Sequence, residues 1–173
     1  MIGYIYPQKV TVKYAMRKLY NPSAPNLVVV CINQVLHGDF LGKFYTRIDL
    51  EPTAFCSTMD MVMKMDSFYN RIRFPQATLQ ARSFLKNGSQ VCAGKANCTY
   101  QIQQEAEKIV EQRGDVATFV VHVQYRQNAT WQGKIVWAEK QAELPFRSAL
   151  EMMRLMDQAI MQQPEGDTEK PDV

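Results

Sequence analysis

The sequence lacks an apolar run long enough to cross a lipid bilayer. A membrane-spanning helix needs roughly 18–20 apolar residues, whereas the longest run here covers residues 27–32, which is the length of a strand. The first ten residues, MIGYIYPQKV, also lack a basic segment followed by an apolar stretch and a small-residue cleavage site, so no signal peptide is expected. We therefore expect a cytoplasmic protein without membrane association.

Motifs for metal binding and for nucleophilic catalysis are also missing. The four cysteines form no Cys-x-x-Cys pair, and the two histidines, His37 and His122, are far apart in the sequence. Cys92 and Cys98 could form a clip, but two more ligands at zinc-like spacing are lacking. No Gly-x-Ser-x-Gly and no phosphate-binding glycine loop is present. The sequence predicts no metal and no cofactor, and an enzyme without a recognisable motif stays an alternative.

A strong excess of one charge is absent as well. Twenty basic residues against seventeen acidic ones give a net charge of +3, far from the clustered positive charge of a dedicated nucleic-acid binder. The hydrophobic content of 46% and the length of 173 residues suffice for a real core. The composition therefore indicates a soluble globular protein that is not specialised for nucleic acids.

What the sequence does contain is an internal repetition. Shifted by 91 residues, the chain aligns with itself without a gap, residues 28–69 against residues 119–160. Nine of the forty-two positions are identical, where chance gives roughly two or three. The identical pairs are Val29/Val120, Val30/Val121, Gly42/Gly133, Lys43/Lys134, Phe55/Phe146, Ser57/Ser148, Met61/Met152, Met65/Met156 and Asp66/Asp157.

Each copy has the pattern of two strands followed by a helix. The β-branched runs NLVVVCI and TFVVHVQY predict a first strand, and FLGKFYTRI and WQGKIVWAE predict a second strand that pairs with it as a hairpin. Ser57 and Ser148 each begin a Ser-x-x-acid capping pattern, after which apolar residues recur at helical spacing. Phe55 and Phe146, just before the caps, are expected to hold each helix against the sheet.

Glycines and methionines in these elements have two interpretations each. Gly42 and Gly133 lie inside predicted strands, where glycine marks a bulge or the close approach of a neighbour. A packed aromatic side chain is favoured over a ligand as that neighbour. The methionines of the two helices are interpreted as core residues, with an adaptable binding surface as the alternative. An exposed Met63 would favour the binding surface.

These patterns predict an α+β fold in which two tandem β-hairpin-plus-helix units pack as one compact domain. The units are residues 28–69 and 119–160, and the domain covers residues 1–161. Because a hairpin and one helix cannot bury both of their faces alone, the units are expected to pack together with antiparallel strands and a pseudo-twofold relation.

Outside the two units the signals are weaker. Residues 71–115 form an insert between the units, with a hairpin-type turn at Asn87-Gly88 and a helix expected over residues 100–113 that ends at Gly114. A further strand is expected near residues 10–14. Residues 162–173 contain two prolines and no aromatic residue, which predicts a disordered tail.

The second unit carries the best candidate for a binding surface. It consists of Arg126, Gln127, Asn128, Trp131, Gln132 and Arg147. In a binding module, the tryptophan would supply contact area and the polar groups would give the contact its direction. Cations, amides and aromatics also bind bases, so nucleic-acid or nucleotide binding through Arg126-Gln127-Asn128 and Trp131 is an alternative, which the small net charge disfavours. A purely structural interpretation places Trp131 in the core and Arg147 in solvent.

The second unit also resembles a segment of known sequences. RQNATWQG at 126–133 and FRSALEM at 146–152 are similar to a pattern, R-Q-N-x-x-W-Q-G followed by F-R-S-x-L-E, of uncharacterised small cytoplasmic proteins of clostridia-type bacteria. FPQA at 74–77 and RSF at 82–84 resemble the same proteins. The resemblance implies a bacterial cytoplasmic protein and brings no activity, substrate or catalytic residue. We therefore expect a non-catalytic binding, regulatory or adaptor module that engages a protein partner or forms a homodimer.

Overall fold

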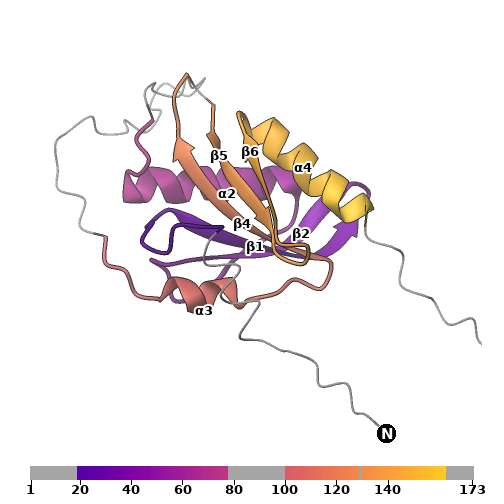
Figure 1. The fold of residues 1–173 in the computed structure, drawn as a ribbon, viewed down its shortest axis with the longest axis horizontal. Coiled ribbons are helices and arrows are strands. Elements are labelled where there is room, and N and C mark those ends of the chain that lie inside the picture. The colour runs from indigo at the N-terminus through magenta and orange to yellow at the C-terminus, as the bar shows by residue number, and fades with distance from the viewer. Residues whose placement is uncertain (1–18, 78–99, 129, 163–173) are drawn as a thin grey trace, which may run out of the picture.

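The computed structural model of the chain describes residues 19–77, 100–128 and 130–162. These residues form an α+β domain with a six-stranded antiparallel sheet and three helices (Figure 1). The elements in chain order are β1 (Leu27–Leu36), β2 (Asp39–Thr46), β3 (Thr53–Phe55), α2 (Thr58–Ile72), α3 (Ala106–Val110), β4 (Ala117–Tyr125), β5 (Gln132–Trp137), β6 (Ala142–Phe146) and α4 (Ala149–Met161).

The strands lie in the order β3-β2-β1-β4-β5-β6. Both predicted hairpins, β1–β2 and β4–β5, are present, and the antiparallel pairing of β1 with β4 joins them into one sheet. Each hairpin carries a third strand that the sequence analysis missed, β3 or β6, so the expectation of hairpin-plus-helix units is corrected. Pro145 lies within β6 and obscured the strand pattern. It is tolerated there because β6 is at the edge of the sheet, where one side of the backbone has no partner strand.

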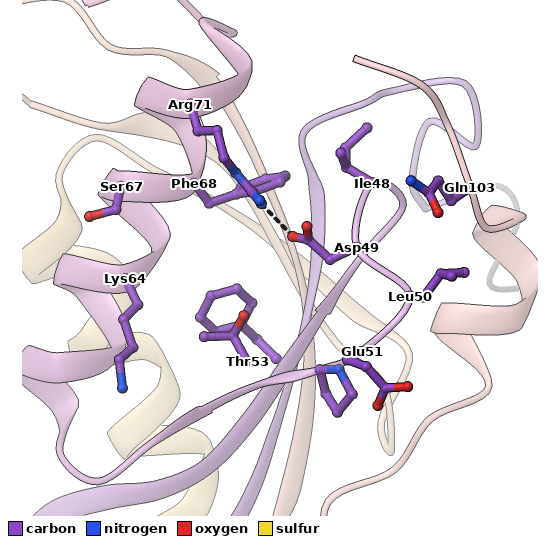
Figure 2. A pocket seen from close by; sticks show the side chains of 12 residues that line it. Ile48, Asp49, Leu50, Glu51, Thr53, Lys64, Ser67, Phe68, Arg71 and Gln103 are labelled. Carbon is purple, nitrogen blue, oxygen red and sulfur yellow. Dashed lines mark hydrogen bonds and ion pairs between the residues drawn. The ribbon is translucent and has the colours of Figure 1, made fainter.

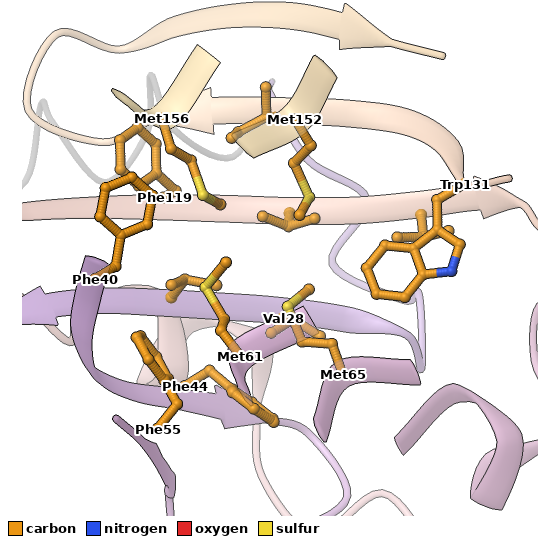
Figure 3. Packing of buried hydrophobic residues seen from close by; sticks show 14 of the residues in the cluster. Val28, Phe40, Phe44, Phe55, Met61, Met65, Phe119, Trp131, Met152 and Met156 are labelled. Atoms are coloured by element: carbon orange, nitrogen blue, oxygen red, sulfur yellow. The ribbon is translucent and has the colours of Figure 1, made fainter. Parts of the chain in front are cut away.

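The helices cover both faces of the sheet. The main core lies under α2 and α4, and a smaller core lies under α3. Alternation along β1 divides its side chains between them, since Val28 and Val30 join the main core and Val29 joins the smaller one. Methionines from both long helices point into the main core (Figure 3). They are Met61, Met65, Met152 and Met156, all fully buried, as the core interpretation predicted.

Both predicted helix caps are confirmed. The hydroxyl of Ser57 accepts a hydrogen bond from the N–H of Asp60 at 3.0 Å, and the Asp60 carboxylate accepts one from the N–H of Cys56 at 3.1 Å. Ser148 and Glu151 repeat the first of these bonds at α4, also at 3.0 Å. These bonds satisfy N–H groups that a helix start otherwise leaves without partners. Phe55 and Phe146, just before the caps, are buried in the main core as expected.

The two strand glycines lie beside backbone bulges. A Cβ atom on Gly42 would collide with the carbonyl oxygen of Cys31, and one on Gly133 would collide with that of His122. The register of β1 on β2 shifts just beyond Ile32, and the register of β4 on β5 shifts at the corresponding place. The predicted bulge is therefore found, in the partner strand. The expected aromatic neighbour is wrong, because a backbone carbonyl makes the close approach.

The helix expected over residues 100–113 is much shorter, since α3 has five residues. Tertiary hydrogen bonds replace helical ones before it. The N–H groups of Gln103 and Gln104 both bind the carbonyl oxygen of Arg47, at 2.9 and 3.1 Å. Gly114 was expected to end this helix, but α3 already ends at Val110, and Gly114 instead packs so closely on the backbone of Ile32 that a Cβ atom would not fit.

Some predictions fall on residues outside the described ranges. They are the strand near residues 10–14, the turn at Asn87-Gly88, the cysteines Cys92 and Cys98, and nearly all of the tail 162–173. No helix within the described ranges is long and apolar enough to span a membrane.

Candidate functional site

The six residues predicted as a binding surface lie in different environments. Arg126 and Trp131 are buried, with 6% and 7% of their surface exposed. Gln127 and Asn128 are exposed in the loop between β4 and β5. Gln132 is half-buried at the start of β5, and Arg147 is exposed just before α4. As a ligand-binding set these residues stay a prediction, and the placement of Trp131 and Arg147 is the one given by the structural interpretation.

Arg126 connects the end of β4 to α2. Its guanidinium donates hydrogen bonds to the Asp66 carboxylate at 2.7 Å and to the Asn70 side-chain oxygen at 2.6 Å. It also lies over the ring of Tyr69, 5.8 Å from the centroid. Residues of α2 therefore already bind the Arg126 guanidinium, and fewer of its N–H donors remain for a ligand.

Trp131 belongs to the same cluster of side chains. Its ring meets that of Tyr69 edge to face, with the centroids 5.4 Å apart and the planes at 86°, a favoured aromatic geometry. Burial raises the pKa of the Tyr69 hydroxyl, and the charge of Arg126 acts in the opposite direction without cancelling it. The cluster therefore serves to hold α2 on the second half of the sheet.

A cavity of about 650 Å³ lies between α2 and the segment that joins β2 to β3 (Figure 2). Phe44, Ile48 and Phe68 give it apolar surface. The polar lining residues come from both walls, with Lys64 and Arg71 on the helix and Asp49 and Glu51 on the loop. A concave site of this size with apolar surface and a few polar groups has the character of a ligand-binding site.

The loop wall of the cavity is held in place by Gln104. Its side-chain amide donates to the carbonyl oxygen of Leu50 at 3.2 Å and to that of Asp49. The hydroxyl of Thr46 accepts the N–H of Asp49 at 3.0 Å, which fixes the turn that enters the loop. Hydrogen bonds from two directions therefore shape this wall without a ligand.

An ion pair joins the two walls. Arg71 and the Asp49 carboxylate are 2.5 Å apart across the cavity, as Figure 2 shows. The Arg71 guanidinium also lies 5.7 Å from the centre of the Phe68 ring. Lys64, on the same wall, bonds to Asp60 at 2.8 Å. Both cations of the cavity thus have partners of opposite charge.

Two exposed methionines extend this site along α2. Met59 and Met63 are 66% and 61% exposed, and together with Ser67 they follow the i, i+4, i+8 spacing of one helix face. Ser67 lines the cavity, and its hydroxyl donates to the carbonyl oxygen of Met63 at 2.9 Å. The exposure of Met63 is the observation that favours an adaptable methionine surface over core packing for these two residues.

Sequence reasoning missed this cavity because its residues lie where the two copies differ. The first copy has RIDLEP at 47–52, and the second has AEKQAE at 138–143. In the second copy β6 begins at Ala142 and pairs with β5 along five residues, whereas β3 has only three residues. In the first copy, the residues between β2 and the short β3 stay outside the sheet and form the loop wall of the cavity. The lack of any identical residue over this stretch of the alignment was the available signal.

Among the residues that the structure describes, the titratable groups outside the cavity are not gathered into a site. His122 is half-buried on β4, where burial and the nearby charge of Lys134 lower its pKa. His37 is exposed at the β1–β2 turn. No three His, Cys, Asp or Glu side chains within the described ranges are grouped as metal ligands would be. Comparisons of this chain with models of protein families, with curated proteins and with solved structures found no match.

Proposed function

We propose that this protein is a non-catalytic binding module that engages a protein partner through the cavity between α2 and residues 48–53. The observation that carries this proposal is the cavity together with the exposed methionines beside it. Exposed methionine is a flexible apolar contact that adapts to the shape of a partner. A concave site flanked by such residues suits an apolar side chain presented by another protein.

The chemistry of the cavity supports a peptide segment better than a small anion. Arg71 and Lys64 already have carboxylate partners, Asp49 and Asp60, so a small anion would have to compete with them. An apolar side chain, in contrast, would cover Phe44, Ile48 and Phe68 without breaking either pair. Polar groups of the partner's backbone would then meet the charged rim, the arrangement of an apolar centre with a polar edge that is common at protein interfaces.

The alternatives have less support. For nucleic-acid or nucleotide binding, Arg126 would have to leave Asp66 and Asn70, and the buried Trp131 would have to leave its place against Tyr69. For catalysis, the described lining of the cavity offers no histidine or cysteine, and the Asp49 carboxylate is already paired with Arg71. A cytoplasmic location and a bacterial origin stay predictions.

The experiment is a selection of binders from a phage-displayed library of random peptides, followed by affinity measurements with the full chain. Ser67→Trp places a large side chain at the cavity, and Gln158→Trp is the matched control on the exposed face of α4. We expect the selected peptides to bind wild type and Gln158→Trp alike and to bind Ser67→Trp roughly tenfold more weakly or worse. Thermal unfolding confirms that each variant folds.

Two results would overturn the proposal. If no peptide binds wild type, or if the peptides bind Ser67→Trp as well as wild type, the cavity is not a protein-binding site. A parallel NMR screen of small organic molecules tests whether the cavity binds small molecules instead of peptides. Small molecules that shift the cavity residues, in the absence of any peptide that does, would make the protein a small-molecule binder.

We also infer that the two halves of the domain arose as an internal duplication related by a pseudo-twofold axis. Support comes from features that recur 91 residues apart. They are the helix caps at Ser57 and Ser148, the bulge-facing glycines Gly42 and Gly133, and the left-handed residues His37 and Asn128. Caps, bulge-facing glycines and left-handed residues each need a particular local backbone geometry. Their recurrence at matching positions is therefore harder to explain by chance than a match between apolar residues.

A further inference from the structure

Four charged side chains line the cavity beside α2, and one of them has no partner of opposite charge. Arg71 pairs with Asp49 at 2.5 Å, and Lys64 pairs with Asp60 at 2.8 Å. The fourth, Glu51, is exposed, and within the described part of the chain its side chain makes no ion pair or hydrogen bond. The rim of the cavity therefore keeps one uncompensated negative charge.

The backbone that carries Glu51 is held on both sides. Before it, the side-chain amide of Gln104 donates to the carbonyl oxygen of Leu50 at 3.2 Å. After it comes Pro52, and the residue that precedes a proline is restricted to extended conformations. Thr53 already belongs to β3, which pairs with β2. Because this backbone has little freedom left to lose, ordering Glu51 against a partner costs less conformational entropy than in an unconstrained loop.

Glu51 also lies beside apolar surface of the cavity. Leu50, the preceding residue, lines the same cavity and is 61% exposed. In Figure 2, the Arg71–Asp49 pair lies toward one end of the cavity and Glu51 toward the other. An apolar side chain in the cavity would therefore have a neutralised ion pair at one end of its site and a free negative charge at the other.

We propose that the partner segment carries a lysine or arginine next to the apolar side chain that enters the cavity, and that this cation pairs with Glu51. The inference rests on the proposed function and adds the charge of the partner to it. Complementary charge at the rim of an interface favours one class of partner and rejects others. An acidic residue at the same place would be repelled by Glu51, and both cations of the cavity, Arg71 and Lys64, already have carboxylate partners.

The test repeats the phage selection with the full chain and with its charge-reversed variant, Glu51→Lys. We expect the peptides selected by wild type to carry basic residues beside the apolar anchor, and those selected by Glu51→Lys to carry acidic residues there. Asp115→Lys reverses another exposed acid, in the segment before β4, and is the matched control. It should select the same peptides as wild type. Thermal unfolding confirms that each variant folds.

Affinity measurements on one selected peptide give the size of the effect. The comparison peptide has glutamine in place of the basic residue. We expect it to bind wild type roughly three- to fivefold more weakly than the parent peptide, the size typical of an exposed ion pair. On Glu51→Gln the two peptides should bind alike. The difference on wild type should also shrink as the salt concentration rises from roughly 50 mM to 500 mM, because salt screens exposed charges.

Failure of this inference is distinguishable from failure of the proposed function. Peptides that Ser67→Trp weakens, but that show no preference for basic residues, overturn the inference and leave the cavity as a binding site. The same holds if the preference persists in Glu51→Gln. If Ser67→Trp weakens none of the selected peptides, the proposed function is overturned and this inference with it.

Two further results would identify a different occupant of the cavity. Sedimentation that reveals a dimer of wild type, made monomeric by Ser67→Trp, would show that a second copy of the chain binds there. Residues 1–18 contain four basic residues and no acid, so the chain's own first residues are the other possibility. They are the occupant if the full chain with Lys9→Glu and Lys13→Glu binds the peptides more tightly than wild type. Either result overturns the proposal of a basic segment from a separate partner.

Discussion

Val29 of β1 and Val120 of β4 are directly paired in the centre of the sheet, and they are 91 residues apart in the chain. The two adjacent pairs are Val28 with Val121 and Val30 with Phe119. A shift of 91 residues carries position 28 to 119 and position 30 to 121, so it exchanges these two pairs. A twofold axis between the two valines would therefore bring β1 onto β4. The proposed duplication requires this relation, and it leads to predictions that come in matched pairs.

The first prediction concerns the bulge glycines. Gly42→Ala and Gly133→Ala each place a Cβ atom against a backbone carbonyl oxygen that a bulge fixes in position. Because a backbone cannot swing away as a side chain can, we expect each substitution to lower the free energy of unfolding by about 1–3 kcal/mol, and by similar amounts. Urea denaturation followed by circular dichroism measures the change.

Gly38→Ala is the control for the glycine pair. A Cβ atom on Gly38 meets nothing within 4 Å, but its φ of +84° disfavours a side chain. We expect a cost of about 0.5–1 kcal/mol. If Gly42→Ala and Gly133→Ala cost no more than this control, the bulge carbonyls are not rigid. A large effect at one glycine and none at the other would count against the duplication.

Much of this architecture is readable from the sequence, for local reasons. The β-branched runs of β1 and β4 and the Ser-x-x-acid caps at Ser57 and Ser148 depend on neighbours in the chain, so their patterns are visible without the fold. The alignment at 91 residues adds the order of the elements. Phe55 and Phe146 could likewise be assigned to the core, because each stands two residues before a cap.

Other features depend on contacts between distant residues and escaped prediction. Gln104 binds the loop that follows β2, and this interaction delays the start of the expected helix. The burial of Arg126 depends on Asp66 and Asn70, which are 60 and 56 residues away in the sequence. The sequence of residues 126–132 has the residue types of a binding surface, and its position between two packed elements was not visible. The cavity likewise needs α2 and the 48–53 loop to be placed together.

The second prediction concerns the buried arginine. Asp66→Ala removes the carboxylate partner of Arg126 and leaves the positive charge of the buried guanidinium without that ion pair. Because Asp66 is itself partly exposed, we expect a loss of about 1–3 kcal/mol in unfolding free energy. Adding Arg126→Met to this variant removes the charge and keeps apolar contact with Tyr69, and it should recover part of the loss. Urea denaturation of the single and double variants measures the coupling.

Arg147→Ala is the comparison for the arginine experiment. Arg147 is exposed, and its guanidinium lies 4.0 Å from the Glu151 carboxylate. Its removal should change the unfolding free energy by less than about 0.5 kcal/mol. If Asp66→Ala lowers the unfolding free energy as little as Arg147→Ala does, groups other than Asp66 stabilise the buried charge of Arg126.

The third prediction is a pH dependence that comes from the α2 cap. The Lys64 ammonium and the N–H of Cys56 both bind the Asp60 carboxylate and hold its pKa below the ordinary value of 3.8. Because the folded-state pKa is the lower one, the stabilisation is complete above the ordinary value and is lost as the pH falls through the folded-state pKa. The difference in unfolding free energy between wild type and Asp60→Asn should therefore shrink below pH 3.8.

Denaturation by urea at a series of pH values tests this dependence. Glu151→Gln changes the equivalent acid of α4, which lacks a lysine at the position of Lys64 because Leu155 stands there. Glu151→Gln therefore serves as the matched control in which a capping acid without a lysine partner is removed. An Asp60→Asn difference that stays constant across the acid range would show that the carboxylate contributes through its shape and not through its charge.

The fourth prediction contrasts the two cysteines of the first half. Cys31 is fully buried in β1, and burial raises the pKa of its thiol to about 11, although the charge of Lys43 acts in the opposite direction. Cys56 is exposed just before the α2 cap. Because the thiolate is the reactive form and access is also required, iodoacetamide at roughly pH 8 should modify Cys56 in the folded protein and leave Cys31 intact.

Mass spectrometry of tryptic peptides after timed alkylation gives the rate at each cysteine. In urea above the unfolding midpoint, the two rates should become similar, because unfolding removes both the barrier to access and the cause of the raised pKa. A Cys31 that reacts as fast as Cys56 under native conditions would mean that β1 opens readily. Since β1 is bonded on both sides up to Ile32, such opening would be incompatible with its place at the centre of the sheet.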